Sequence, residues 1–274
     1  RGCNTPSVSL NADNRTGGAL FFEWISTNGD PIDNPNTSTP VVSTLGEYQL
    51  LLTDLDNGCS TQATVNVLDN SDPPIVAIET PVSLTCSLPE LTLSSSISSN
   101  TGTNPTYNWT TLNGNIVTNG NTLSPTVDQS GTYLLTVTNN ENGCLGQEEI
   151  LVQADQLDPS IMIMPYEQLD CANSTLSIDA SISSGNNTLG FEWTSTTGNI
   201  LNAVNSSIIE VDAPGLYQLI LNDLINGCAD TLSTIVNQDT IAPLVAIAMP
   251  GQLDCMNESI LLDAQASSAG PDLQ

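Results

Sequence analysis

The sequence predicts an all-β protein built from tandem immunoglobulin-like β-sandwich domains in an extended array. Three observations predict this class: a set of residues that recurs about every 84 positions, short apolar runs with strand-like alternation, and turn signals between those runs. Self-similarity at a fixed period is typical of arrays of small structural units, and about 84 residues is an ordinary size for an independent domain.

Cysteine, tryptophan and tyrosine define the repeat. A tryptophan follows the opening cysteine of each of three copies by 21 to 23 residues, and a tyrosine lies 11 residues before the cysteine that ends an Asn-Gly-Cys triplet. The opening cysteines are Cys3, Cys86, Cys171 and Cys255; the aromatic residues are Trp24, Trp109, Trp193, Tyr48, Tyr133 and Tyr217; the triplets end at Cys59, Cys144 and Cys228. One aromatic residue of each kind at a fixed position predicts packing in each domain core, in preference to a sugar-binding platform.

Apolar alternation predicts the strands, and proline marks the linkers. Tyr133, Leu135 and Val137 are two residues apart and therefore share one face of a strand. Asn-Gly pairs separate the runs, which is a hairpin signal. We predict repeat 1 at 1–70 with its first strand missing, repeat 2 at 71–156, repeat 3 at 157–239, and the start of an incomplete repeat 4 at 240–274. We expect a segment of a longer chain.

The charge balance excludes several classes of partner. The chain has 30 acidic residues, two arginines, no lysine and no histidine, for a net charge of −28. Nucleic acids and anionic membranes both require a basic face, so neither is an expected partner. The longest apolar stretch, near Ile241 to Met249, is far shorter than the roughly 20 residues of a membrane-spanning helix. Catalysis is not expected either, because the usual bases are missing and the acidic motifs repeat or are scattered.

The seven cysteines predict disulfides and an oxidising compartment. Pairing within each copy would join Cys3–Cys59, Cys86–Cys144 and Cys171–Cys228. In a sandwich, however, the first turn and the last hairpin lie about 25 Å apart along the strands, whereas a disulfide needs Cα atoms within about 7 Å. Pairing between copies would join Cys3–Cys144 and Cys86–Cys228, and would leave Cys59, Cys171 and Cys255 for copies outside this segment. We favour the pairing between copies and keep the other as an alternative.

The repeat resembles a known family of modules. Phe22-Glu-Trp24, Tyr107-Asn-Trp109 and Phe191-Glu-Trp193, followed by Gly-x-Tyr and Asn-Gly-Cys, are similar to the polycystic-kidney-disease-type, immunoglobulin-like repeats of very large Bacteroidota surface proteins. The resemblance covers essentially the whole chain, although the Trp-Asp-Phe-Gly-Asp-Gly motif of the better-known branch is absent. It implies export to the bacterial cell surface and a role in an adhesin, a gliding track or a filament.

Carboxylates recur at the linkers and in the last hairpins. Oxygen ligands gathered at a domain junction suit calcium, which takes six to eight of them. The candidate ligands are Asp69, Asp72, Asp155, Asp158, Asp239, Glu141 and Asp223. The alternative is that aspartate before proline performs ordinary turn chemistry. No other cofactor is expected.

The sequence therefore predicts a structural role. We expect a segment of an extracellular bacterial stalk, adhesin shaft or surface filament, stiffened by disulfides and, where bound, by calcium. Further copies of the same repeat are the expected partners. One alternative is a module that binds glycans or cell-surface proteins, for which the loop at residues 30–36 is the place to look. Another is a spacer for a catalytic domain outside the segment.

Overall fold

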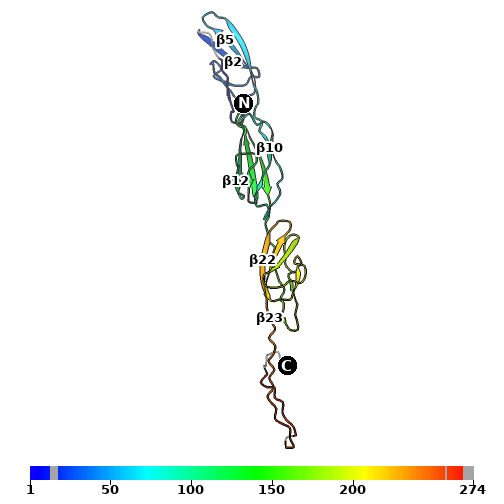
Figure 1. The fold of residues 1–274 in the computed structure, drawn as a ribbon. Helices are drawn as coiled ribbons and strands as arrows, with labels where there is room; N and C mark the ends of the chain where they lie inside the picture. The colour runs from blue at the N-terminus through cyan, green and yellow to red at the C-terminus, as the bar shows by residue number, and fades with distance from the viewer. Residues whose placement is uncertain (13–17, 257, 268–274) are drawn as a thin grey trace. The chain divides into compact units, whose positions relative to one another are not determined.

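Figure 1 shows a computed structural model of the chain, which describes residues 1–12, 18–256 and 258–267. Its regular elements are all strands, and no helix occurs among these residues, so none there is long and apolar enough to cross a membrane. The all-β class and the tandem immunoglobulin-like domains are confirmed. The chain divides into two compact units, Arg1–Gln156 and Leu157–Gln274. The break between them falls at the predicted boundary of repeats 2 and 3.

Repeat 1 has two three-stranded antiparallel sheets among its described residues. The first contains β1 (Val8–Ser9), β3 (Ile32–Asp33) and β4 (Val41–Val42), in the order β1-β4-β3. The second contains β2 (Leu20–Ser26), β5 (Gly46–Asp54) and β6 (Ser60–Val67), in the order β2-β5-β6. β6 is therefore an edge strand.

Repeat 2 contains two three-stranded sheets like those of repeat 1 and four further strands. Its large sheet has the order β11-β14-β15, from β11 (Thr106–Thr111), β14 (Gly131–Thr138) and β15 (Leu145–Val152). A second sheet has the order β12-β13-β9, from β9 (Leu91–Thr92), β12 (Ile116–Thr118) and β13 (Thr126–Val127). β7 (Ile75–Ile78) pairs antiparallel with β10 (Ser95–Ser99), and β8 (Leu84–Thr85) pairs parallel with β16 (Ala154–Asp155). The first strand thus crosses from one sheet to the other.

Repeat 3, in the second unit, follows the same plan. Its large sheet has the order β19-β21-β22, from β19 (Leu189–Ser195), β21 (Gly215–Asp223) and β22 (Ala229–Val236). β18 (Leu176–Asp179) pairs with β20 (Ile208–Val211), and β17 (Leu169–Asp170) pairs parallel with β23 (Gln238–Asp239).

In each of repeats 1, 2 and 3, a main-chain nitrogen near the start of the repeat donates a hydrogen bond to a carbonyl just after the last long strand. The N–H of Leu84 donates to the carbonyl of Gln153 at 2.9 Å, and Leu169 donates to Asn237 at 3.0 Å. In repeat 1 the donor is the N-terminal ammonium of Arg1, which bonds the carbonyl of Leu68 at 3.1 Å. Arg1 therefore corresponds in position to Leu84 and Leu169, which come after the point at which the chain crosses from one sheet to the other.

Residues after β23 keep the hydrogen-bonding pattern of a first strand. Ala248 N–H donates to the carbonyl of Asp263 at 2.8 Å, and Ala246 N–H donates to Ser267 Oγ at 3.0 Å. The same two bonds, 84 residues earlier, join Met164 to Asp179 and Met162 to Ser183.

Repeats 1, 2 and 3 each have a core of their own, and the predicted tryptophans lie in these cores. Every tryptophan Nε1–H donates to the carbonyl found 13 residues later. The pairs are Trp24–Thr37 at 3.1 Å, Trp109–Thr122 at 2.9 Å and Trp193–Ser206 at 3.1 Å. The ring is thereby buried while its polar atom stays satisfied.

The buried tyrosines form a second repeated contact. Each hydroxyl donates to the carbonyl four residues earlier: Tyr48–Thr44 at 2.9 Å, Tyr133–Gln129 at 2.5 Å and Tyr217–Ala213 at 2.7 Å. This is the tyrosine corner of immunoglobulin-like sandwiches. It ties the start of the central strand to the preceding loop.

Candidate functional site

The Asn-Gly-Cys triplet forms the same tight loop in every repeat. In repeat 2, Gly143 has a φ of +71° and donates its N–H to the carbonyl of Asn139, while Cys144 N–H donates to Asn142 Oδ1 at 2.9 Å. The corresponding bonds from cysteine N–H to asparagine are 2.8 Å at Cys59–Asn57 and 2.8 Å at Cys228–Asn226. Glycine suits this position because a left-handed φ costs it nothing.

The loop of repeat 2 is joined covalently to the first turn of repeat 1. Cys3 and Cys144 form a disulfide with a Cα–Cα distance of 5.0 Å, across a sequence separation of 141 residues. The Cα separation is within the ordinary range for a disulfide. This is the pairing between copies, and it forms inside the first unit.

Close backbone packing surrounds this bond. A β-carbon at Gly2 would overlap the carbonyl oxygen of Asn142, and one at Gly143 would overlap the side chain of Asn4. Asn4 N–H also donates to the carbonyl of Asn142 at 3.4 Å. Both glycines therefore allow an approach that side chains would prevent.

Asn142 connects the loop to the linker between repeats 1 and 2. Its side chain is buried, and its Nδ2 donates to Asn70 Oδ1 and to the carbonyl of Asp72, each at 3.4 Å. Its Oδ1 meanwhile fixes the loop through Cys144. Because one buried amide bonds both parts, the linker and the hairpin are held together by polar contacts as well as by sulfur.

The alternative pairing within copies is wrong. The Cys3–Cys144 bond rules out both Cys3–Cys59 and Cys86–Cys144, and Cys59 and Cys171 are free and exposed, which rules out Cys171–Cys228. The physical reason is distance along a strand. Arg1, next to the first turn, bonds Leu68 just after the end of β6, whereas Cys59 precedes its start. Eight strand residues span roughly 26 Å.

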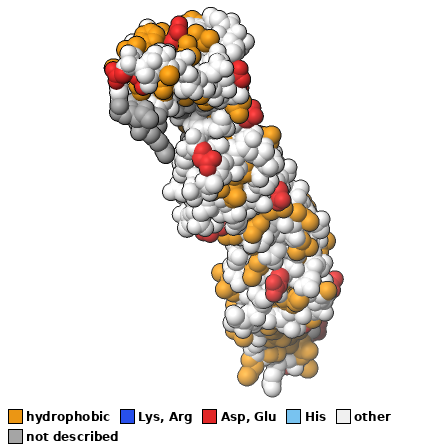
Figure 2. Space-filling view, turned by 90° about the horizontal axis from the view of Figure 1, so that it is seen from above, with side chains coloured by type: hydrophobic (Ala, Val, Ile, Leu, Met, Phe, Trp, Pro, Cys, Tyr) orange, Lys and Arg blue, Asp and Glu red, His pale blue; other side chains and the backbone are white. Residues whose placement is uncertain are grey.

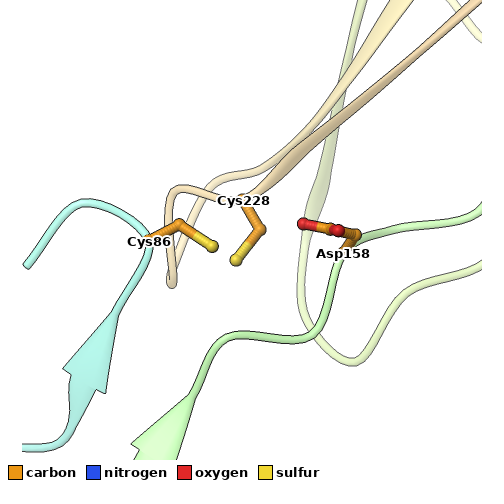
Figure 3. A group of neighbouring side chains, drawn as sticks. All are labelled: Cys86, Asp158 and Cys228. Atoms are coloured by element: carbon orange, nitrogen blue, oxygen red, sulfur yellow. The ribbon is translucent and has the colours of Figure 1, made fainter. Parts of the chain in front are cut away.

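In the third loop, Asn226 and Cys228 are buried, and Asn226 contacts the segment that leads into repeat 3. Asn226 Nδ2 donates to the carbonyl of Leu157 at 3.2 Å. Figure 3 shows Asp158 in the segment beside the loop of Cys228, with their ligand atoms within 4.8 Å of each other. Cys228 is disulfide-bonded, as is Cys86 of the first unit. A disulfide sulfur is not a thiolate, so Cys228 does not offer a metal ligand to Asp158.

The candidate calcium ligands of the first unit are mostly engaged locally. Asp69 Oδ1 accepts from Ser71 Oγ and N–H, and the Ser71 hydroxyl is the main reason that the pKa of Asp69 is lowered. Glu141 Oε1 accepts from the hydroxyl of Thr103 at 2.6 Å and from its N–H at 2.9 Å, which lowers the pKa of Glu141. Asp72 is exposed, and Asp155 lies in β16.

The predicted calcium ligands of the second unit also make local hydrogen bonds. Asp223 is buried and accepts from Asn226 N–H at 3.1 Å, Ile225 N–H at 2.9 Å and Asn187 Nδ2 at 3.0 Å. Burial, the largest single effect, raises the pKa of Asp223, but these hydrogen bonds together lower it. Asp239 Oδ1 accepts from the N–H of residue 241 at 3.1 Å. Within the described part of either unit, no three of the predicted ligands come within 4.8 Å of one another.

Sequence reasoning missed the polar residues of the junction. Gly2, Asn70 and Asn142 make or permit its contacts, yet the predicted site residues at this junction are cysteines and carboxylates. The available signal is the asparagine of the triplet, which is present in all three copies as Asn57, Asn142 and Asn226.

Comparison with known proteins gives likeness to solved structures alone. No protein-family model and no curated protein matches the chain. Extracellular domains 3–5 of Drosophila OTK are 10% identical, with 85% of this chain and 92% of that chain covered, at a TM-score of 0.34. The three N-terminal domains of the bacteriophage RB49 highly immunogenic outer capsid protein are 13% identical, with 86% and 98% covered, at a TM-score of 0.38. TM-scores this low carry no conclusion about fold or function.

Proposed function

We propose that this chain is a structural segment of an extracellular stalk, adhesin shaft or surface filament, in which disulfides fasten each repeat to the next. The observation that carries the proposal is the Cys3–Cys144 bond, which joins the first turn of repeat 1 to the last hairpin of repeat 2. A bond inside one sandwich would stabilise that domain alone. A bond between sandwiches also fixes their junction.

The pairing seen at Cys3–Cys144, between the first turn of one repeat and the last hairpin of the next, also assigns the next bond. Cys86 occupies the position of Cys3 one repeat later, and Cys228 occupies the position of Cys144. Both are disulfide-bonded cysteines. We therefore assign Cys86–Cys228 as the bond between repeats 2 and 3. Because its loop overlaps that of Cys3–Cys144, pulling on the chain ends would load both bonds.

Cysteine chemistry and surface charge support an extracellular setting; the bacterial surface is proposed on the resemblance of the repeat alone. Disulfides persist in oxidising compartments. Figure 2 shows acidic side chains scattered singly over a mostly uncharged surface. With a net charge of −28, neighbouring chains repel each other at low salt, which keeps a long polymer dispersed. Further copies of the repeat are the proposed partners along the chain.

Calcium remains a prediction for the linkers. Asp69 and Glu141 already accept hydrogen bonds from Ser71 and Thr103. A bound ion would replace those contacts, so calcium should raise the thermal midpoint of the protein if the prediction holds, and should leave it unchanged if these carboxylates serve only their turns. No second function is advanced: the loop considered for glycan binding, residues 30–36, contains the short strand β3, which pairs with β4 at the edge of a sheet, and nothing observed in the loop points to a ligand.

Single-molecule stretching tests the proposal. An unfolded chain of 274 residues extends to about 960 Å at about 3.5 Å per residue. With both bonds intact, the shortest covalent path runs from Arg1 to Cys3, from Cys144 back to Cys86, and from Cys228 to Gln274, which is about 106 residues or about 370 Å. Oxidised chains should stop near the shorter length, and reduced chains should reach the longer one. Oxidised chains that extend fully would contradict the proposal.

A further inference from the structure

The linker between repeats 1 and 2 contains the peptide bond Asp72–Pro73, whose carbonyl group contacts a buried side chain. Asn142 Nδ2 donates a hydrogen bond to the carbonyl oxygen of Asp72 at 3.4 Å. Asn142 is 5% exposed, and its Oδ1 accepts from the N–H of Cys144 at 2.9 Å, which fixes the direction of the amide. A fixed polar donor therefore lies against the oxygen of this peptide bond.

The two residues that form this bond have the chemistry to break it. Attack of an aspartate Oδ on the carbonyl carbon of the same residue closes a small ring, and covalent structure already holds the two groups near each other. Proline supplies a tertiary amide nitrogen without an N–H, which leaves as a secondary amine. Asp72 and Pro73 are both exposed, so water reaches the bond. Among the described residues, no hydrogen bond engages the Asp72 carboxylate.

Two further Asp-Pro bonds in the chain provide a comparison, Asp30–Pro31 and Asp158–Pro159. In repeat 3, Asn226 is the counterpart of Asn142, and its Nδ2 donates to the carbonyl of Leu157 at 3.2 Å. That carbonyl belongs to the residue before Asp158, because the Asp-Pro pair lies one residue later in this linker. Within the described residues, Asp72–Pro73 is therefore the one Asp-Pro bond whose carbonyl accepts from a side-chain amide.

The residues on both sides of the bond are held in place separately. After it, the carbonyl of Pro73 accepts from Asn100 Nδ2 at 3.3 Å, and Pro74 is buried against Gly146. Before it, the hydroxyl and the N–H of Ser71 both donate to Asp69 Oδ1. These contacts do not pass through the Asp72–Pro73 bond, so they persist when it is broken.

We propose that Asp72–Pro73 is a site of intramolecular peptide-bond scission, with Asp72 as the nucleophile and Asn142 as the donor to the developing oxyanion. The Asp72 carboxylate attacks its own main-chain carbonyl carbon. The bond from this carbon to the Pro73 nitrogen then breaks, and the nitrogen keeps the electron pair and takes a proton from solution. One water opens the cyclic anhydride that remains, which leaves a carboxyl-terminal Asp72 and an amino-terminal Pro73. Each molecule reacts once, on itself, and the net reaction consumes one water.

The Asn142 amide acts at the step in which negative charge develops. Its bond to the Asp72 carbonyl is long in the uncut protein, and hydrogen bonds of this kind tighten and strengthen when the acceptor oxygen becomes charged. Loss of one such donor typically slows a reaction by about a hundredfold or more. The position of Asn142, and not the Asp-Pro sequence alone, should therefore set the rate.

The Cys3–Cys144 disulfide determines what scission does to the molecule. Cys3 lies before the cut and Cys144 lies after it, so the pieces stay covalently joined. The product is a two-chain protein of 72 and 202 residues (274 minus 72). The proposal goes beyond the array function and does not depend on it, because the reaction uses only the linker and the hairpin of repeat 2.

The rates at the three Asp-Pro bonds of one molecule test the proposal. The full oxidised chain is incubated in a mildly acidic buffer in which tryptophan fluorescence shows it folded, and mass spectrometry after reduction quantifies each cut. We expect scission at Asp72–Pro73 to be at least about tenfold faster than at the other two bonds, and at least about tenfold slower once urea unfolds the chain and removes the Asn142 contact. Equal rates at the three bonds, no scission, or a rate at Asp72–Pro73 that rises in urea would overturn the proposal.

A pair of exposed substitutions provides the second arm. Asp72→Asn removes the nucleophile and should abolish the 72-residue fragment, whereas Asp158→Asn, the matched control, should leave it unchanged. Before reduction, the cut protein should be a single species that is heavier by one water; after reduction it should separate into two fragments. A 72-residue fragment that persists in the Asp72→Asn protein would overturn the proposal. Stretching of uncut oxidised chains is unaffected by either result, so failure here leaves the array function standing.

Discussion

Gly143 lies against Asn4 so closely that a β-carbon at position 143 would overlap the Asn4 side chain. The contact joins the last hairpin of repeat 2 to the first turn of repeat 1, one residue from the sulfur of Cys144. Gly58 occupies the same place in the hairpin of repeat 1, with a φ of +77°, and a β-carbon there would meet nothing within 4 Å. The two glycines share a backbone conformation and differ in their neighbours.

Gly143→Ala should therefore destabilise the first unit more than Gly58→Ala. Both substitutions place alanine in a left-handed conformation, which costs about 1 kcal/mol. Only Gly143→Ala also displaces Asn4, which should add at least about 1 kcal/mol. Urea unfolding followed by tryptophan fluorescence measures both. Equal losses would show that the junction does not restrict this position.

Cys3→Ser should lower the stability of the first unit substantially. The disulfide closes a loop of 141 residues, for which the chain-entropy model gives about 5 kcal/mol. Cys59→Ser is the matched control, because Cys59 is free and exposed. The shift in urea midpoint of the first variant, absent from the second, measures the effect. A Cys3→Ser protein as stable as the control would mean that the bond adds nothing to the folded unit.

Stability should fall at alkaline pH through the buried tyrosines. Burial is the main reason that the pKa values of Tyr133 and Tyr217 are raised. A raised pKa in the folded state means that their contribution is fully present below the unfolded value of about 10 and is lost as pH rises above it. Tyr133→Phe and Tyr217→Phe should flatten unfolding free energy against pH above about 10. Tyr107→Phe, at a half-buried tyrosine of β11, is the control and should leave that slope in place.

Stability should also fall in acid through Glu141. Its pKa is lowered by the Thr103 hydroxyl first and by the Thr103 N–H second. A lowered folded pKa contributes stability that is present above the unfolded value of about 4.3 and is lost as pH falls through the folded value. Glu141→Gln should weaken the acid dependence of the urea midpoint, whereas Glu148→Gln, at an exposed position of β15, should not. An acid dependence equal in both variants would contradict this role for Glu141.

Much of the fold could be predicted because its determinants are local and repeated. Each copy places one tryptophan and one tyrosine at fixed positions, and the structure buries all six. The tyrosine corner follows from the Gly-x-Tyr pattern. Periodicity reports such positions well, since three copies of the same contact reinforce one another.

The number of strands is harder to predict. The apolar runs of the sequence indicate about seven strands in each repeat, whereas residues 71–156, which form repeat 2, contain ten. The run Leu91–Ile97 resembles one strand, but the chain changes sheets after Leu93: the Leu93 N–H still donates to the carbonyl of Pro125 beside β13, whereas Ser95 already pairs with β7. Alternation cannot reveal such a crossing, because the side chains keep their order while the hydrogen-bond partner changes.

The candidate site divides in the same way. The positions of the cysteines in the repeat and the length of the strands together favour the Cys3–Cys144 bond. The rise per strand residue sets the distance between the two ends of a sandwich, and that distance is too long for a disulfide within one copy. The contacts of the predicted calcium ligands, in contrast, could not be predicted from the sequence. The carboxylates of Asp69 and Glu141 accept hydrogen bonds from the hydroxyls of Ser71 and Thr103. Nothing in the repeated sequence pattern indicates those contacts.

Mapping the disulfides of the native, oxidised protein tests the central claim most directly. Digestion at aspartate and at aromatic residues under non-reducing conditions, followed by mass spectrometry, identifies each linked pair of peptides. We expect a Cys3 peptide linked to a Cys144 peptide and a Cys86 peptide linked to a Cys228 peptide. A Cys3–Cys59 or Cys86–Cys144 link as the main product would contradict it.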